Sequence, residues 1–338
     1  MDLNTVWFLL IGVLIIGYAI LDGFDLGVGV LHLFTKDENE KRVNLNAIGP
    51  VWDGNEVWLL TGGGALFAAF PVVYATVFSG FYLALMLVLF ALIFRAVSME
   101  FRGKVESPKW KNAWDWAFGL GSLLPAILFG VAMGNILRGV PINENGMFTG
   151  TFFTLLNPYS ILVGVLSLVM FTMHGAIYMA MKSDGNQLER MKKIIPSLWI
   201  AFVVIYVLAT LYTFFEAGYL FEGLLSNVLF WIIFIVLLAS IISIPVSVKG
   251  GKYGRAFLAS SLTIASMIGL LAVSLFPRLV PSLTDLAYSL TIYNASSTPR
   301  TLLTMLIIAI IGVPLVLIYT IYIYRAFKGK VIIDEHSY

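Results

Sequence analysis

The chain has 338 residues, of which 59% are hydrophobic and only 12% are charged, with a formal net charge of +2. A soluble domain typically carries about 25% charged residues, and here the apolar residues lie in blocks long enough to cross a hydrocarbon layer of roughly 30 Å. Cysteine is absent, which excludes disulfides and thiolate metal sites. Because β-barrel spans would be short alternating segments, the composition predicts an all-α polytopic membrane protein.

Continuous apolar blocks predict nine membrane-spanning helices within a single integral membrane domain, residues 1–338. Pro71 separates the second helix from the third, and a charged segment over 36–42 separates the first two. The sequence contains no phosphate loop, nucleophile motif or nucleic-acid-binding pattern. The predicted helices lie at about 6–34, 50–70, 73–98, 115–138, 158–181, 196–216, 225–248, 254–276 and 301–325.

The basic residues predict how these helices are oriented. Of the 21 Lys and Arg residues, 18 follow helices one, three, five and seven or lie in the C-terminal tail. The opposite side carries only Arg138, Arg278 and Arg300. Since cytoplasmic loops carry an excess of Lys and Arg, we expect the N-terminus outside and the C-terminus in the cytoplasm.

Four acidic side chains interrupt the first two predicted helices. Asp22 and Asp25 fall in the cytoplasmic half of the first, and Asp53 and Glu56 fall in the first turns of the second. Each pair is spaced i, i+3 and therefore shares one helix face. A carboxylate at such depth is costly and usually faces a protein interior or a wet path. Arg95, at the same end of the third helix, can balance part of the charge.

Purely structural roles for these acids remain open. Asp53 and Glu56 can complement a helix dipole, a contribution of about 0.3–1 kcal/mol, and Asp22 and Asp25 can hydrogen-bond to neighbouring helices. Nearby small residues allow helices to approach closely in membranes. We expect this packing role for Gly17, Gly23, Gly27, Gly29 and Gly54.

Histidines and aromatic residues offer weaker candidates. A buried bis-His heme needs two histidines on facing helices. His174 is better interpreted as a helix–helix hydrogen bond and His32 as a residue at the membrane boundary, while His336 lies in the tail. We expect no metal site and no heme ligated by this chain. An interfacial aromatic belt is predicted for residues 114–116 (Trp-Asp-Trp) and for Tyr319, Tyr322 and Tyr324.

The longest of several ordered motifs is Gly-Pro-Val-Trp-Asp-Gly-Asn-Glu-Val-Trp-Leu-Leu-Thr-Gly-Gly-Gly-Ala-Leu-Phe-Ala-Ala-Phe-Pro at 49–71, preceded by Gly-Phe-Asp-Leu-Gly-Val-Gly at 23–29. These motifs resemble subunit II of cytochrome bd quinol oxidases. Further matches are Phe-Ser-Gly-Phe-Tyr (78–82), Phe-Arg-Gly-Lys (101–104), Trp-Asp-Trp (114–116), Leu-Asn-Pro-Tyr (156–159), Ser-Leu-Phe-Pro (274–277) and Asn-Ala-Ser-Ser (294–297).

The resemblance implies a fold and an assembly. It implies two four-helix bundles plus one peripheral helix, in a multi-pass protein of the bacterial cell membrane. The expected function is that of a subunit in a terminal oxidase that passes electrons from quinol to oxygen. The partner would be subunit I, which carries two b-type hemes, one d-type heme and the quinol-oxidising loop. The resemblance leaves open a small single-helix third subunit and the choice of quinone, and it implies contact with membrane lipid.

Site roles follow from the same resemblance. The residues matching Asp53 and Asp25 lie on or near a proposed proton path in the family, and the position of Arg95 is also basic there. We therefore propose a proton path formed by Asp22, Asp25, Asp53, Glu56 and Arg95. In some members the residue matching Trp58 lines a proposed oxygen route. The chain is short between helices six and seven, so family contacts in that region do not transfer.

Two other functions compete with an oxidase subunit. Buried acids would also suit a proton-coupled secondary transporter, although such proteins usually show interrupted helices in two matching halves. A purely structural scaffold would be indifferent to its acids. Co-purification with a heme protein separates the first function from the second, and neutral substitutions of the acids separate it from the third.

Overall fold

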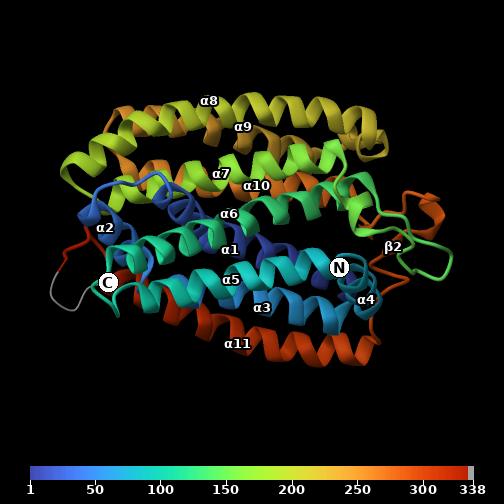
Figure 1. Cartoon of the computed structure of the whole chain (residues 1–338). Helices are drawn as coiled ribbons and strands as arrows, with labels where there is room; N and C mark the ends of the chain where they lie inside the picture. The colour runs from blue at the N-terminus through green and yellow to red at the C-terminus, as the bar shows by residue number, and fades with distance from the viewer. Residues whose placement is uncertain (334–338) are drawn as a thin grey trace.

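The computed structural model describes residues 1–333, in which helices dominate and a two-stranded sheet is the only sheet. Most of the helices run along the long axis of one elongated bundle (Figure 1). The N-terminus lies at one end of the bundle, and the last turn of the final helix lies at the other. The α-helices are α1 (Leu3–His32), α2 (Glu38–Ile48), α3 (Trp52–Ala69), α4 (Pro71–Gly80), α5 (Tyr82–Arg102), α6 (Pro108–Arg138), α7 (Pro158–Lys182), α8 (Gly185–Glu216), α9 (Val228–Lys249), α10 (Tyr253–Leu275) and α11 (Pro299–Ala326).

The two strands and the short 3-10 helices lie in the connections between the α-helices. Strands β1 (Arg278–Val280) and β2 (Leu290–Thr291) pair antiparallel at the end of the bundle that also contains α4. Four short 3-10 helices complete the described chain: η1 (Phe152–Leu155), η2 (Gly218–Phe221), η3 (Leu224–Ser226) and η4 (Leu286–Tyr288).

The predicted fold class is confirmed. Among residues 1–333, eight helices are long and apolar enough to cross a membrane, and α4 is a shorter apolar helix. Eight of the nine predicted blocks each coincide with one helix, and the third, 73–98, is divided between α4 and α5. The second block coincides with α3, which is not among the eight helices. The molecule is thus an all-α polytopic membrane protein.

Local sequence sets the helix starts. The side chains of Asp2, Asn157 and Thr298 accept hydrogen bonds from backbone N–H groups three residues further on, as N-caps do. Proline occupies the first turn of α4, α6, α7 and α11, where its missing N–H has no intrahelical partner to lose. Pro71 therefore ends α3 and begins α4, as predicted.

Three boundaries differ from the prediction. The predicted helix 73–98 is interrupted at Phe81, where the ring of Phe148 packs so closely on Gly80 that a Cβ there would lie 2.7 Å from it. The segment predicted as a charged connection contains α2, which Asp37 caps and which buries Leu45 and Ile48 on one face. Helix α8 starts at Gly185, because its first turns are polar and extend beyond the apolar block.

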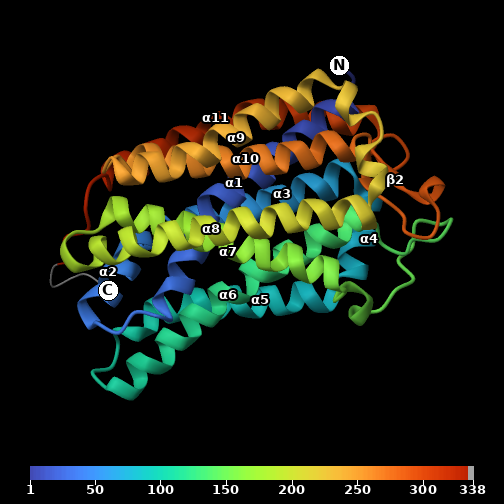
Figure 2. The ribbon, with the colours of Figure 1, turned by 90° about the horizontal axis from the view of Figure 1, so that it is seen from above.

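The helices form two groups that meet along α1, α6 and α7. Helices α1, α3, α5 and α6 make the first group, and α7 to α10 make the second. The view from above shows α9 and α10 on one side of α1 and α5 on the other (Figure 2). Helix α11 contacts α1 and α3 from outside and buries only Leu302, so it is the peripheral helix.

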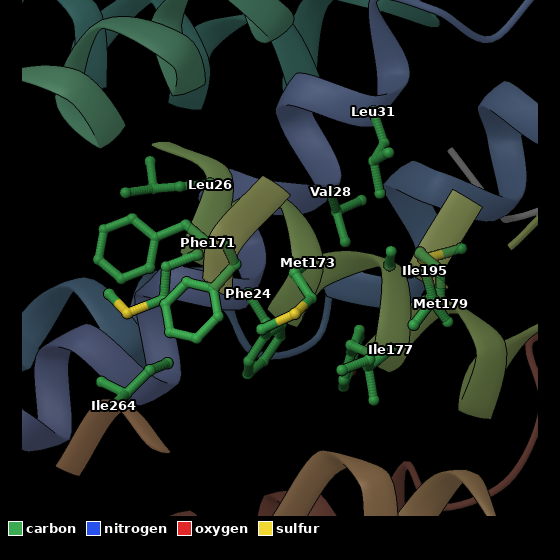
Figure 3. Close-up of a cluster of buried hydrophobic side chains, with 14 of the residues drawn as sticks. Phe24, Leu26, Val28, Leu31, Phe171, Met173, Ile177, Met179, Ile195 and Ile264 are labelled. Atoms are coloured by element: carbon green, nitrogen blue, oxygen red, sulfur yellow. The ribbon is translucent and has the colours of Figure 1, made fainter. Parts of the chain in front are cut away.

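The core lies where the two groups meet. Phe24, Leu26 and Val28 of α1 pack among Phe171 and Ile177 of α7 (Figure 3). All of these side chains are buried. Burial of this apolar surface against neighbouring helices keeps the second half of α1 in a fixed position, which also fixes its acidic residues.

Glycines bring α1 and α7 into backbone contact. A Cβ on Gly27 would lie 1.9 Å from the carbonyl oxygen of Phe171, and one on Gly175 would lie 2.6 Å from the backbone of Gly27. Only glycine allows this approach. Gly17, Gly23 and Gly29 also meet neighbouring side chains, as predicted. Gly54 was predicted to pack as well, and this was wrong within the described chain, because nothing lies within 4 Å of its Cβ position.

Candidate functional site

The centre of the candidate site is a buried ion pair between α1 and α5. Arg95 donates from Nη2 to Asp22 Oδ1 at 2.5 Å and from Nη1 to Asp22 Oδ2 at 3.1 Å. Both side chains are 0% exposed. Gly121 of α6 allows the approach, since a Cβ there would lie 2.9 Å from the backbone nitrogen of Arg95. The two-pronged geometry is the strong form of an arginine–carboxylate pair.

Glu56 of α3 approaches the same guanidinium from a third helix. Its Oε1 lies 3.1 Å from Arg95 Nη2, although the orientation does not make a hydrogen bond. The side chain is 22% exposed, so Glu56 lies at the edge of the cluster. A single arginine therefore contacts two carboxyl groups.

Asp25 is held separately by an amide. Asn55 Nδ2 donates to Asp25 Oδ2 at 2.7 Å and to the carbonyl oxygen of Leu21 at 3.2 Å. Asn55 Oδ1 in turn accepts a 2.9 Å hydrogen bond from the hydroxyl of Tyr324 on α11. The other oxygen of Asp25, Oδ1, is buried and has no hydrogen-bond partner in the described chain.

Charge in this cluster is not balanced. Asp22, Asp25 and Glu56 surround Arg95, which is the one basic side chain that forms an ion pair with any of them among the described residues. If all three carboxyls were ionised, two negative charges would be uncompensated in a largely apolar setting. Such uncompensated charge is costly to bury.

Asp53 does not join the buried cluster. It is exposed in the first turn of α3, next to exposed Gly54. The i, i+3 spacing with Glu56 correctly places both on one side of the helix, but only Glu56 reaches Arg95. We name Asp22, Asp25, Glu56, Arg95 and Asn55 the acid cluster from here on.

Trp58 turns from α3 toward α1. Its ring packs against Gly17 so closely that a Cβ there would lie 2.3 Å from Trp58 Cε3. Its indole Nε1 is buried and has no hydrogen-bond partner in the described chain. The ring is half-buried, between the helix interface and the outer surface of α3.

A second buried charged cluster lies at the end of the bundle that contains α2. Asp115 of α6 accepts hydrogen bonds from Arg102 Nε at 2.5 Å, from Lys41 Nζ at 2.7 Å and from His32 Nε2 at 2.8 Å. Arg102 also donates to Glu38 at 2.8 and 2.9 Å. We name these five residues the end cluster.

The end cluster corrects two predictions. His32 was expected at the membrane boundary, but it is buried because Asp115 binds its ring nitrogen. Asp115 was expected within an aromatic belt, yet only Trp116 of that triplet is strongly exposed, and Asp115 points inward. Neither contact is visible in the sequence, since Asp115 lies far along the chain from Lys41 and His32.

His174 is occupied by protein contacts. Its Nδ1 lies 2.6 Å from Ser260 Oγ and its Nε2 lies 3.1 Å from the carbonyl oxygen of Ile20, and the ring stacks on Phe257 at 4.7 Å. The predicted helix–helix hydrogen bond is thus confirmed. An axial heme bond at His174 would have to displace one of these partners. His336 lies outside the described residues.

Sequence reasoning missed Asn55 and Tyr324. Asn55 lies between two acids in the motif at 49–71, and because it is neutral it was not predicted to be part of the site. Tyr324 was assigned to the aromatic belt with Tyr319 and Tyr322, which are indeed exposed. Tyr324 instead points inward to Asn55. An i, i+2 change of face on one helix would have been the available signal.

The fold and the site together define a multi-pass membrane protein with an acid-rich polar centre. Comparison with known proteins gives the family. The family model for cytochrome bd terminal oxidase subunit II matches residues 3–327, and the chain belongs to that family.

Curated relatives agree over nearly the full length. The chain is 38% identical to a probable cytochrome oxidase subunit 2 of Haemophilus influenzae, covering 97% of this chain and 95% of the relative. It is 37% identical to the cytochrome bd-I ubiquinol oxidase subunit 2 of Escherichia coli K12, with the same coverage. Identity to the cytochrome bd ubiquinol oxidase subunit 2 of Bacillus subtilis is also 37%, over 98% of this chain and 97% of the relative.

A solved structure shares the fold. The chain matches one from the bd oxidase of Geobacillus thermodenitrificans with a TM-score of 0.80 at 18% identity, covering 97% of this chain and 99% of the other. Membership of the family implies an oxidoreductase complex that contains hemes and quinol. The apolar helices and the relatives together support a multi-pass protein of the inner membrane.

Proposed function

We propose that this chain pairs with the heme-bearing subunit I of a quinol oxidase and delivers protons to it through the acid cluster. The observation that carries the proposal is the unbalanced charge around Arg95, with three carboxyl groups and one guanidinium. Family membership supplies the chemistry that would consume those protons. The basic residues of the sequence favour uptake from the cytoplasm, at the end of the bundle that contains α2 and the last turn of α11.

Reduction of oxygen to water consumes one proton for each electron, and protons cross apolar regions poorly without titratable stations. Asp25 suits such a station, because one of its oxygens is held by Asn55 and the other is free to bind a proton. Protonation forms an O–H bond on the carboxylate, and release inward restores the ion. Glu56, at the edge of the cluster, and Asp53, exposed on α3, extend the proposed path toward a partner.

The hemes and the quinol supply electron transfer and oxygen chemistry when bound to the complex. We assign their ligation to subunit I, since both ring nitrogens of His174 contact this chain's own groups. His32 contributes one nitrogen to Asp115. Within residues 1–333 no group of three or more His, Asp or Glu residues is arranged to hold a metal ion. A small third subunit would take no part in heme ligation.

Trp58 extends the proposal to oxygen. Its half-buried ring lies between the outer surface of α3 and Gly17, and its indole nitrogen has no partner in the described chain. A large flat side chain between lipid-facing surface and helix interior is suited to border a path for a small apolar molecule. We propose that oxygen enters along this border.

The experiment that tests proton delivery replaces Asp25 by asparagine in the assembled oxidase. Asparagine keeps the size and much of the hydrogen bonding of Asp25 but cannot bind a proton by ionising. Loss of a positioned proton-transfer group typically costs about 10²-fold or more, so turnover per heme should fall by at least tenfold in Asp25→Asn. The loss should grow at alkaline pH, where protons are scarcer. Asp53→Asn should also slow turnover.

A matched control is Glu106→Gln, which neutralises a carboxyl whose side chain is 92% exposed, in the α5–α6 connection. It should leave turnover and heme content unchanged. If heme content falls in parallel with activity in Asp25→Asn, the acid is structural and the scaffold function is correct. If both single variants and the double variant keep full turnover with normal heme, proton delivery through this chain is excluded.

A further inference from the structure

A pocket opens at the end of the bundle where α11 finishes. Its volume is about 330 Å³, and its lining combines the end of α2, the turn before α3, the end of α7, the end of α11 and the segment that follows α11. We name it the tail pocket and define it by Tyr178, Lys182, Tyr324, Phe327 and Lys330. The lining mixes polar and apolar groups, so water can occupy it.

One side chain, Tyr324, connects the lining of the tail pocket to the acid cluster. Tyr324 lines the pocket, and its hydroxyl donates to Asn55 Oδ1 at 2.9 Å. Asn55 then donates to Asp25 Oδ2 at 2.7 Å. Two hydrogen bonds therefore separate the pocket lining from a carboxylate that is 0% exposed and has one free oxygen.

The second tyrosine of the pocket is fixed by its neighbours. The hydroxyl of Tyr178 donates to the carbonyl oxygen of Ala47 at 2.9 Å, and its ring stacks on Phe24 at a centroid distance of 4.0 Å. These two contacts fix the side chain of Tyr178 between α1 and α2. Tyr324 is the pocket tyrosine whose hydroxyl points to the acid cluster.

The C-terminal segment builds the outer wall by specific contacts. Lys182 Nζ donates to the carbonyl oxygen of Phe327 at 2.6 Å, and the backbone N–H of Val331 donates to the carbonyl oxygen of Lys182 at 2.9 Å. Lys330 forms an ion pair with Asp184. Contacts at both ends of the segment hold it over the end of α7, so the pocket is a built feature of the fold.

We infer that the tail pocket is the entrance through which protons reach Asp25, with Asn55 and Tyr324 as the positioning residues that hold the receiving carboxylate. The inference rests on the proposed function and adds its route. A hydronium ion in the pocket gives up a proton and becomes water, the proton ends as an O–H bond on the carboxylate of Asp25, and the next proton enters the pocket from the solvent side. Asn55 and Tyr324 keep Asp25 oriented and are not themselves required to ionise.

The absence of cysteine from the sequence allows a direct test. Ala326→Cys places one thiol on the exposed lining of the tail pocket, and a methanethiosulfonate reagent then fills the pocket through a mixed disulfide. In the assembled oxidase, labelling should lower turnover by about fivefold or more, with the greater loss at alkaline pH, and reduction of the mixed disulfide should restore it. Heme content should not change.

The matched control is Val105→Cys, an exposed position in the α5–α6 connection, at the same end of the bundle but outside the pocket. Labelling there should leave turnover unchanged, and the unsubstituted complex under the same reagent gives the baseline. Full labelling of Ala326→Cys without loss of turnover overturns the inference. Failure of the reagent to reach that thiol in the folded complex also overturns it, because an entrance must be open.

A second pair of variants tests the positioning role. Tyr324→Phe removes the hydrogen bond to Asn55, and loss of one such bond should slow turnover by about fivefold and shift the pH profile. Tyr322→Phe, whose side chain is 67% exposed two residues earlier, should change neither. Equal behaviour of the two variants removes Tyr324 from the route.

The outcomes separate this inference from the proposed function. If Asp25→Asn slows turnover and a filled tail pocket does not, protons reach Asp25 by another route, and only the inference fails. If Asp25→Asn is neutral, the proposed function fails, whatever the pocket does.

Discussion

The two buried charged clusters of this protein differ in their charge balance. In the end cluster, the two carboxyls of Asp115 and Glu38 face Arg102, Lys41 and His32, and Asp115 accepts four hydrogen bonds. In the acid cluster, Asp22 and Glu56 contact the single guanidinium of Arg95, and Asp25 is bonded to Asn55 instead. Atoms of Asp25, Glu56 and Arg95 have no hydrogen-bond partner in the described chain.

The difference shows what each cluster is suited to do. A charge-balanced cluster joins elements, and the end cluster connects α1, α2, α5 and α6 at one end of the bundle, although Nδ1 of His32 has no hydrogen-bond partner in the described chain. An unbalanced cluster is costly to bury for packing alone, and the proposed function assigns the acid cluster to proton delivery. We therefore expect substitutions in the end cluster to change stability and those in the acid cluster to change turnover.

The largest expected effect is loss of stability in Arg102→Ala. Removing this side chain leaves Asp115 and Glu38 with fewer cations in a partly buried site, and breaking a buried ion pair typically costs about 3–5 kcal/mol. The yield and thermal midpoint of the purified oxidase should fall, while turnover per heme in the surviving complex stays normal. Lys104→Ala, an exposed lysine two residues further on, is the control and should change little. Equal stability of the two variants would refute a structural role for the end cluster.

A paired substitution compares the clusters directly. Asp115→Asn leaves Arg102 and Lys41 without their shared carboxylate and should destabilise the complex nearly as much as Arg102→Ala. Asp22→Asn breaks a fully buried pair but leaves Arg95 with Glu56 at 3.1 Å and keeps a hydrogen-bonding amide, so its stability cost should lie at the lower end of that range, about 3 kcal/mol.

Activity should show the reverse order in this pair. Turnover per heme should fall in Asp22→Asn and remain normal in Asp115→Asn. Thermal unfolding and oxygen consumption measured on the same two preparations check both expectations. If both variants lose stability alike and keep normal turnover, the distinction between the clusters is wrong.

The mildest perturbation tests which end of the bundle faces the cytoplasm. A reporter fused after Lys330 should behave as cytoplasmic, and one inserted in the 139–157 connection should behave as external, because most basic residues lie in segments at the α2 end. The opposite pattern would place the end cluster and the tail pocket outside and would exclude uptake from the cytoplasm. The same side for both reporters would contradict the number of membrane crossings.

The sequence by itself determined the helices and the residues able to carry charge. Blocks of apolar residues fix where spans lie, because each backbone group in lipid must be satisfied within its own helix. Pro71 fixes the break between α3 and α4 for an equally local reason, its missing N–H. The sequence did not predict the polar first turns of α8 or the amphipathic helix α2, because the segments that form them are short or charged. Helix ends also depend partly on packing.

The tertiary structure decided which charges meet. Spacing placed Asp53 and Glu56 on one side of a helix, but only the positions of α1 and α5 made Glu56 the neighbour of Arg95 and left Asp53 outside. The contacts of Asn55 with Asp25 and Tyr324 join three helices, and the last of these lies 269 positions along the chain from Asn55. Local patterns describe one helix at a time, whereas an ion pair or a hydrogen bond across a bundle depends on how the helices rotate and pack. That rotation is set by close contacts such as Gly27 against Gly175, which only the folded chain reveals.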